Sequence, residues 1–150
     1  MAIFGYSLRA ALGLGLAACT TALAASAPAA GEDGPGAYLC TFKAGSTISY
    51  AKGVYKARPA AVLTFEIGQI DLDGQKAALV TDKGKGPLRV VRAVNANHYL
   101  EVVAEGFLNL TTIYDKDPRR GLHPAAHSRH FGLFGEPQIA QYHGFCRAKG

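Results

Sequence analysis

Two predicted β-strands and the turn between them lie in Tyr99-Leu-Glu-Val-Val-Ala-Glu-Gly-Phe-Leu-Asn-Leu-Thr-Thr-Ile-Tyr114. On each side of Glu105-Gly106, leucine, valine or alanine occupies alternate positions. Period-2 alternation bounded by a polar turn is typical of half-buried strands joined in a hairpin. The second run ends in Thr111-Thr-Ile-Tyr114, and β-branched and aromatic residues are common in strands. This stretch predicts antiparallel β structure.

The same periodicity continues on both sides of this hairpin. Turn residues at Asp73-Gly74, 84–87 and 95–97 separate the alternating runs. Short connections between most of the runs predict an antiparallel meander of eight or nine strands. The expected fold is therefore all-β, either a small closed up-and-down barrel or a two-sheet sandwich, because periodicity alone does not separate the two. The predicted strands are 38–43, 46–51, 61–72, 76–82, 87–94, 98–104, 107–114, 127–134 and 138–145.

The composition of the 150 residues, with 49% hydrophobic and 18% charged side chains, fits one folded domain and excludes a disordered chain. The first thirty residues differ from the rest, because Arg9 is their one charged side chain. An apolar run follows at 10–18, which is too short to span a bilayer, since spanning needs about 20 residues. This pattern predicts a signal peptide over 1–24, a flexible leader or tether over 25–36 and a folded domain over 37–150.

Two routes of processing fit the leader. Ala22-Leu-Ala24 is a small-x-small site, so that cleavage after Ala24 would release a soluble protein. Leu16-Ala-Ala-Cys19 resembles the bacterial lipoprotein signal, in which Cys19 becomes lipidated. Either route predicts an exported protein, periplasmic or extracellular, without a transmembrane helix and with a lipid anchor as one alternative.

Export makes the cysteine positions informative. Cys40 and Cys146 lie at the two ends of the predicted domain. An oxidising compartment favours a disulfide between them. Metal binding by two distant cysteines is the less favoured alternative, because no CxxC motif is present. A disulfide here also predicts that the first and last strands are neighbours.

The formal charge of +5 is concentrated in two groups of basic residues, Lys83 to Arg92 and Arg119-Arg120. Nucleic acid is not expected as a partner, because no aromatic side chains are interleaved with these residues. An anionic envelope polymer or an acidic envelope protein fits better, while two solvated basic turns need no partner at all.

Three histidines within eight residues, His123, His127 and His130, suggest a metal site. Strand geometry argues against it, because His127 and His130 would point to opposite faces of a strand over 127–134. We therefore expect structural roles for the three histidines and no metal or other cofactor.

Strand alternation places Arg129 on the same face as His127, Phe131 and Leu133, and thus toward the core. A guanidinium facing inward either ties strand ends through a carboxylate or backbone carbonyls, or binds an anionic ligand at the barrel mouth. Ser128 cannot be activated by His127, because adjacent strand residues diverge, and no catalytic motif occurs. The sequence therefore predicts a protein that is not an enzyme.

A resemblance to known proteins lies in Ala126-His-Ser-Arg-His-Phe-Gly-Leu-Phe-Gly-Glu-Pro137 and Gln141-Tyr-His-Gly-Phe-Cys146, preceded by Leu108-Asn-Leu-Thr-Thr-Ile-Tyr114. The pattern, over roughly residues 100–146, resembles a family of small uncharacterised exported proteins of alphaproteobacteria. The resemblance implies export and no particular activity. The layout is more loosely similar to the periplasmic inhibitors of c-type lysozyme, small disulfide-stapled barrels that are often lipid-anchored, although their inhibitory loop matches no stretch here.

Two functions are therefore expected as alternatives. The first is an exported, non-enzymatic envelope protein that binds another protein or an anionic polymer through its basic turns or its 115–126 loop. The second is a carrier of a small ligand or a metal, with a site at the barrel mouth near His127, Arg129 and Tyr142. The interior of the barrel separates the two, because a carrier needs a hollow one.

Overall fold

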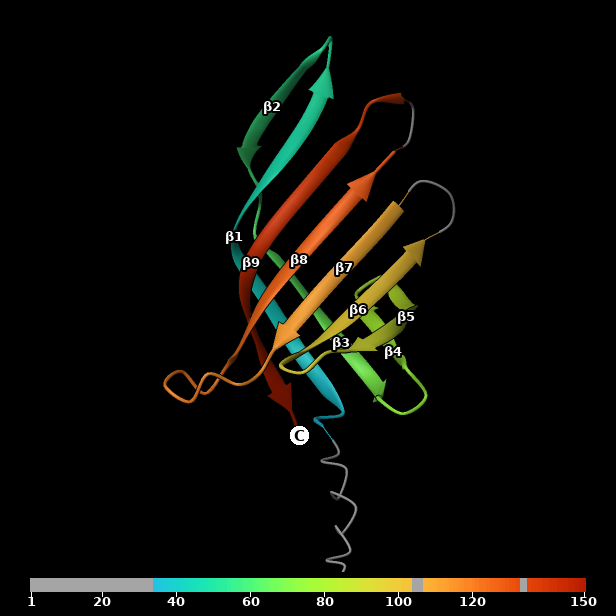
Figure 1. Cartoon of the computed structure of the whole chain (residues 1–150), viewed down its shortest axis with the longest axis vertical. Helices are drawn as coiled ribbons and strands as arrows, with labels where there is room; N and C mark the ends of the chain where they lie inside the picture. Colours follow the sequence, from blue (N-terminus) through green and yellow to red (C-terminus); the bar gives the residue numbers. More distant parts are fainter. Residues whose placement is uncertain (1–33, 104–106, 133–134) are drawn as a thin grey trace, which may run out of the picture. The chain divides into compact units, whose positions relative to one another are not determined.

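The computed structural model describes residues 34–103, 107–132 and 135–150. Every regular element within them is a strand, as expected (Figure 1). No helix in these ranges is long and apolar enough to cross a membrane. The predicted signal peptide over 1–24 and most of the predicted tether lie outside the described residues. The strands are β1 (Ala37–Ala51), β2 (Val54–Pro59), β3 (Leu63–Asp71), β4 (Lys76–Thr81), β5 (Gly84–Arg92), β6 (Ala96–Val103), β7 (Phe107–Tyr114), β8 (His123–Phe131) and β9 (Gln138–Lys149).

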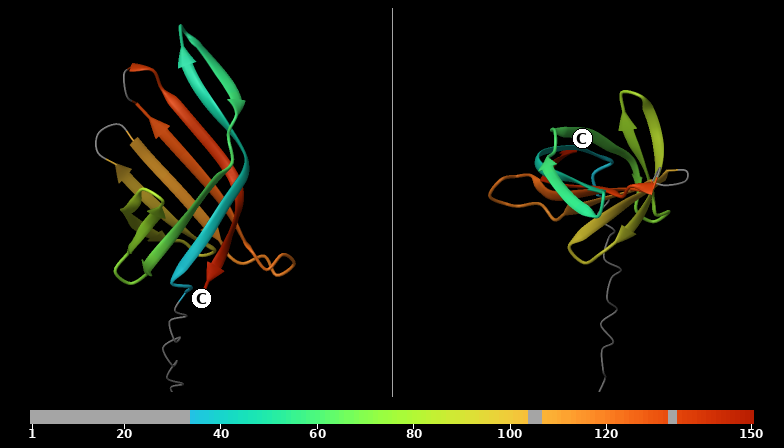
Figure 2. Two further views of the ribbon diagram at one scale, coloured as in Figure 1. Left: turned by 180° about the vertical axis from the view of Figure 1, so that it is seen from behind. Right: turned by 90° about the horizontal axis from the view of Figure 1, so that it is seen from above.

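Eight of the strands form a closed antiparallel barrel, and β2 is added to it. The order around the barrel runs from β1 to β3 and then through consecutive strands to β9, which pairs again with β1. Residues 38–42 of β1 pair with β3, whereas residues 46–51 of the same strand pair with β2. The β1–β2 hairpin therefore extends beyond the other strands at one end of the barrel (Figures 1 and 2). The barrel alternative is confirmed, and the sandwich is not formed.

Several predicted boundaries were wrong, for reasons that the structure shows. The expected strands 38–43 and 46–51 are one continuous β1 that bends at a β-bulge between Thr41 and Ala44. Strand β2 was missed because all its side chains are exposed and give no alternation. The turn expected at 84–87 belongs to β5, and the chain reverses at Asp82-Lys83 instead. Strand β8 begins at His123 rather than 127, with Pro124 near its start, where a proline is tolerated.

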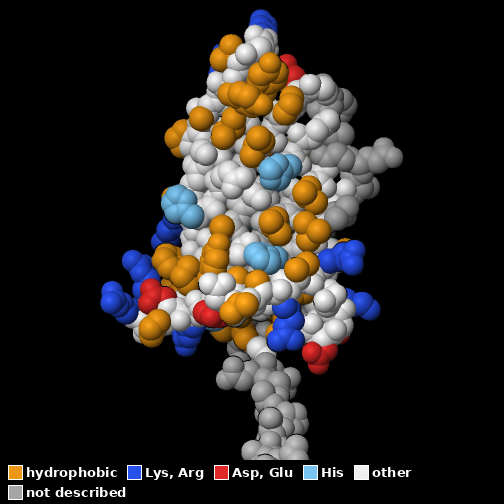
Figure 3. All heavy atoms as spheres, viewed as in Figure 1, with side chains coloured by type: hydrophobic (Ala, Val, Ile, Leu, Met, Phe, Trp, Pro, Cys, Tyr) orange, Lys and Arg blue, Asp and Glu red, His pale blue; other side chains and the backbone are white. Residues whose placement is uncertain are grey.

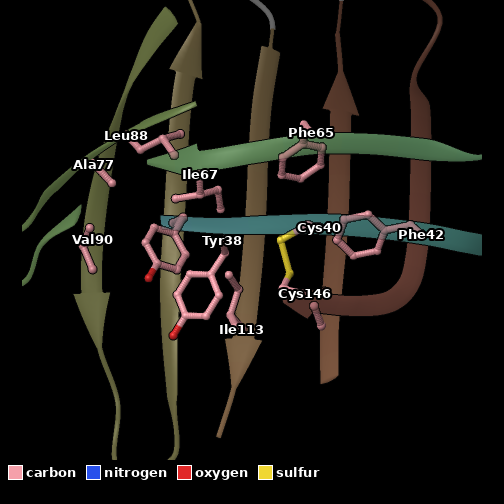
Figure 4. Packing of buried hydrophobic residues seen from close by; sticks show 12 residues of the cluster. Tyr38, Cys40, Phe42, Phe65, Ile67, Ala77, Leu88, Val90, Ile113 and Cys146 are labelled. Atoms are coloured by element: carbon pink, nitrogen blue, oxygen red, sulfur yellow. A yellow bond between two sulfur atoms is a disulfide. The ribbon is translucent and has the colours of Figure 1, made fainter. Parts of the chain in front are cut away.

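The core fills the end of the barrel away from the β1–β2 hairpin. Tyr38, Cys40 and Phe42 alternate along β1 with half-buried or exposed neighbours and are themselves buried. Figure 4 shows Phe65 and Ile67 of β3 packed beside them, and the rings of Phe42 and Phe65 stack at 5.5 Å between centroids. Each such side chain stabilises the fold by about 1.5–3 kcal/mol through burial.

The predicted disulfide between Cys40 and Cys146 is present, and it joins directly opposed residues of β1 and β9. Both cysteines are fully buried in the core. The bond connects residues 106 positions apart, so that it closes most of the barrel into one loop. In the chain-entropy model a loop of this length contributes about 4–5 kcal/mol to stability.

Non-reducing mass spectrometry of peptides should therefore find Cys40 linked to Cys146, with neither thiol available to alkylation in the native protein. Replacing both residues by alanine should lower the free energy of unfolding by about 4 kcal/mol or more, because the cross-link and some packing are lost. A reductant should destabilise the wild type and leave the double variant unchanged. Alkylation of Cys40 and Cys146 in native protein would contradict the pairing.

Candidate ligand-binding site inside the barrel

Strands β6, β7 and β8 build one wall of the barrel interior. Tyr99 is opposite Thr111, Thr111 is opposite His127, and His127 is opposite Tyr142 of β9. Directly opposed residues of antiparallel strands point to the same side of a sheet. Tyr99, Thr111 and His127 are all buried, which identifies that side as the interior.

A second polar row lies two residues further along the same strands, toward the end with the β1–β2 hairpin. Glu101 is opposite Asn109, and Asn109 is opposite Arg129. Because side chains alternate with a period of two, this row faces the interior as well. Two adjacent rows of polar side chains therefore cover one wall of the barrel.

A chain of hydrogen bonds determines the tautomer of His127. Arg129 Nε donates to His127 Nε2 at 3.2 Å. A guanidinium N–H is always a donor, so His127 Nε2 must be unprotonated and the ring proton must lie on Nδ1. Nδ1–H then donates to Thr111 Oγ1 at 2.8 Å. Both ring nitrogens are used, and the imidazole holds the Arg129 side chain in place.

Burial keeps this imidazole neutral. His127 is 4% exposed, and desolvation, followed by the charge of Arg129, lowers its pKa from 6.5 to about 4. The neutral form is the one that can accept the hydrogen bond from Arg129. At neutral pH the pair therefore carries one positive charge, on the guanidinium.

The guanidinium of Arg129 is half-buried and uncompensated. Of the predicted alternatives, the tie to a carboxylate is not formed, because no Asp or Glu of the described ranges lies within 4.0 Å of this guanidinium. The two ion pairs among the described residues involve Arg92 and Lys149 instead. The one hydrogen bond of this guanidinium to a described residue uses Nε. The two Nη groups are thus the donors left for a ligand, and a planar guanidinium suits a carboxylate.

A cavity of about 550 Å³ lies against this wall. Leu63, Phe65, Leu79 and Leu88, from β3, β4 and β5, supply an apolar lining. Further lining comes from Thr81, Asp82 and Lys83, at the end of β4 and in the turn that follows it. Polar lining comes from Thr64 of β3 and, on the wall of β6 to β8, from Tyr99, Glu101, Asn109, Thr111, His127 and Arg129. This combination of an apolar surface with a few polar groups, and this size, are typical of small-molecule sites.

One hydrogen-bond acceptor beside Arg129 has no partner. Asn109 Nδ2 donates to Glu101 Oε2 at 2.6 Å, and this contact assigns Oδ1 as the other atom of the amide. Asn109 Oδ1 is buried without a hydrogen bond to any described group. The hydroxyl of Tyr99 is also buried and unpartnered, and burial raises its pKa, so that it stays protonated.

The structure brings together two of the three residues predicted for a ligand site. His127 and Arg129 line the cavity, whereas Tyr142 packs against the ring of His127 at 5.8 Å and against Phe42 at 6.4 Å. Tyr142 therefore supports the imidazole from the side. Leu133, expected on the same face, lies outside the described residues.

The three histidines do not converge. His123 Nδ1 donates to the carbonyl oxygen of Tyr114 at 2.9 Å, and its ring packs on Tyr38 at 5.0 Å. His130 is exposed, whereas His127 is buried, as the alternation along β8 requires. Within the part of the chain that the structure describes, no three His, Cys, Asp or Glu side chains are grouped for a metal ion.

Glu101, Asn109 and Thr111 were missed as site residues. The sequence places Glu101 and Asn109 on the two sides of a predicted turn, but their pairing depends on the strand register, in which Val103 is opposite Phe107 and Glu101 is opposite Asn109. The sequence does not say that this polar face, rather than the leucine face, is the interior.

The depressed pKa of His127 predicts a pH-dependent stability. Between pH 6.5 and about 4 the unfolded chain binds a proton at this residue and the folded protein does not, so stability is lost as the pH falls through that range. The loss should reach about 3 kcal/mol by pH 4. Urea unfolding of the wild type and of His127→Asn, which does not titrate, measures it at each pH. The two curves should converge as the pH falls, and parallel curves would show that His127 is not held neutral.

Comparison of the chain with family models, with curated proteins and with solved structures finds no match. A function for it therefore has to follow from the chemistry of the cavity.

Proposed function

We propose that the barrel binds a small organic carboxylate in its interior, as a carrier or sensor and not as an enzyme. The observation that carries this proposal is the guanidinium of Arg129, which is half-buried at a cavity of about 550 Å³ with no carboxylate within 4.0 Å among the described residues. A cation that is partly removed from water and has no ion-pair partner is costly. A carboxylate ligand would supply that counter-ion.

The position of Arg129 is set before any ligand arrives. Its Nε is held by His127, and His127 is held in turn by Thr111 and by the ring of Tyr142. A guanidinium fixed in this way loses little side-chain freedom when it binds a carboxylate, so more of the interaction energy appears as affinity.

The rest of the ligand is selected by the two walls. Leu63, Phe65, Leu79 and Leu88 favour an apolar or aromatic body. Asn109 Oδ1 and Glu101 are acceptors in the same row as Arg129, and they favour an O–H or N–H group on the ligand. The best ligand class is therefore a small, mainly apolar carboxylate that also carries a hydrogen-bond donor.

Proton transfer by His127 does not fit this site. Both nitrogens of the imidazole are engaged, and its pKa of about 4 leaves it unprotonated at neutral pH. A general base needs a free nitrogen and a pKa near the working pH. These properties support a binding function.

The place of action remains the predicted exported compartment. A disulfide such as Cys40–Cys146 persists in oxidising environments, which agrees with export. Cleavage after Ala24 and lipidation of Cys19 stay predictions, because both residues lie outside the described ranges.

Titration with 3-(4-hydroxyphenyl)propionate, followed by NMR shifts of the cavity residues, tests the proposal. Binding should move the resonances of Leu88, Asn109 and Arg129. The methyl ester of the same compound should bind at least about tenfold more weakly, because it lacks the charge that pairs with Arg129. 3-Phenylpropionate should bind more weakly too, because it leaves Asn109 Oδ1 without a donor.

Arg129→Met should weaken the carboxylate by about tenfold or more and leave the affinity of the ester nearly unchanged. Arg89→Met is the matched control, because Arg89 is an exposed cation of β5, and it should bind like the wild type. Equal affinity of ester and carboxylate, or shifts confined to residues outside the cavity, would overturn the proposal.

A further inference from the structure

A second hollow, also of about 550 Å³, lies on the outer surface of the barrel. Tyr38, Cys40 and Phe42 of β1 are buried, so the alternating residues Leu39 and Thr41 face outward, away from the core. Apolar and basic side chains form this hollow, which we call the basic groove. They are Leu39, Leu122 and Phe145, which are partly buried, and Lys43, Arg120 and Arg147, which are exposed.

The groove is built by local backbone features of β1 and β9. Phe145 is opposite Thr41, and the β-bulge that follows places an extra residue of β1 against Gly144. A Cβ on Gly144 would collide with the carbonyl oxygen of Thr41, so only glycine allows the strands to approach here. The bulge breaks the regular ladder next to Lys43, and bulges commonly redirect side chains in this way.

One of the three cations has a fixed position. The guanidinium carbon of Arg120 lies 4.8 Å from the centre of the Phe145 ring, which is a cation–π contact. Arg120 comes from the loop between β7 and β8. Asp117 closes a turn there, because it accepts hydrogen bonds from the backbone N–H groups of residues 119–121 and donates to the carbonyl oxygen of Leu122. One cation of the groove, Arg120, is therefore held in position by Phe145, an apolar residue of the same groove.

The charges of the groove are all positive. No carboxylate lines it, and none lies within 4.0 Å of Lys43, Arg120 or Arg147 among the described residues. Figure 3 shows that Lys and Arg side chains gather mainly at the lower end of the face drawn, the end near the β7–β8 loop in Figure 1. An anionic group is the charge-complementary occupant.

We infer that the basic groove binds one molecule of an anionic amphiphile, with a phosphate head among Lys43, Arg120 and Arg147 and an apolar chain on Leu39, Leu122 and Phe145. Arginine pairs bind phosphate through several charge-assisted hydrogen bonds. The apolar floor would be unused by a uniformly charged polymer. The concave shape and its volume fit a single small molecule better than a flat membrane surface.

Isothermal titration with dodecyl phosphate, below its micelle concentration, tests this site in the full exported protein. Inorganic phosphate and dodecyl maltoside present the head and the chain separately, and each should bind at least about tenfold more weakly. Arg120→Glu with Arg147→Glu should reduce the affinity for dodecyl phosphate by about tenfold or more. Both arginines are exposed, and an unchanged melting temperature would confirm that the variant is folded.

Lys56→Glu with Arg58→Glu is the matched control, because it makes the same change of net charge on the exposed strand β2. This variant and Arg129→Met should both bind dodecyl phosphate like the wild type, which separates the groove from the barrel interior. Equal weakening by the two charge reversals, or loss of binding in Arg129→Met, would overturn the assignment. The assignment would also be overturned if the protein bound anionic vesicles or polyglutamate but did not bind dodecyl phosphate.

Discussion

The pairing of β1 with β9 is the constraint on which the rest of the structure depends. Strand β1 has fifteen residues and contacts β9 on both sides of its bulge, while its other edge is shared between β3 and β2. This pairing converts an open meander into a closed barrel, and the Cys40–Cys146 disulfide fixes it inside the core. Without closure, the polar wall of β6 to β8 would not face the apolar wall of β3 to β5, and neither would enclose a cavity.

Much of the fold could be predicted from local chemistry. Alternation around Ile67 and turn residues such as Asp73-Gly74 predicted strands and hairpins, and the expectation of export led to the prediction of the disulfide. What could not be predicted depends on long-range packing. Strand β2 has no buried side chain that would produce a pattern, and the continuity of β1 depends on a bulge that forms only against Gly144 of β9.

The candidate site was predictable only in part. Alternation placed His127 and Arg129 on one inward face, because Phe131 shares their parity. Strands usually turn their apolar face toward the interior, and this rule would place Leu100 of β6 and Leu110 of β7 inside the barrel. In this barrel the opposite, more polar face of β6 and β7 points inward. Glu101, Asn109 and Thr111 face the cavity instead, where Asn109 donates to Glu101 and Thr111 accepts from His127. Asn109 Oδ1 and the hydroxyl of Tyr99 are left without a partner there. This arrangement of bonded and free polar groups depends on the cross-strand register, which is a property of the assembled barrel.

We propose that a neutral His127 holds Arg129 in place for an anionic ligand. Nitrogen-15 NMR of the histidine side chains tests it most directly, since the two ring nitrogens have different shifts when protonated or bare. At pH 7, Nδ1 of His127 should be protonated, Nε2 should be bare, and the Arg129 Nε–H should exchange slowly. A proton on Nε2, or an imidazolium at that pH, would contradict it, because Arg129 would then have no acceptor on His127.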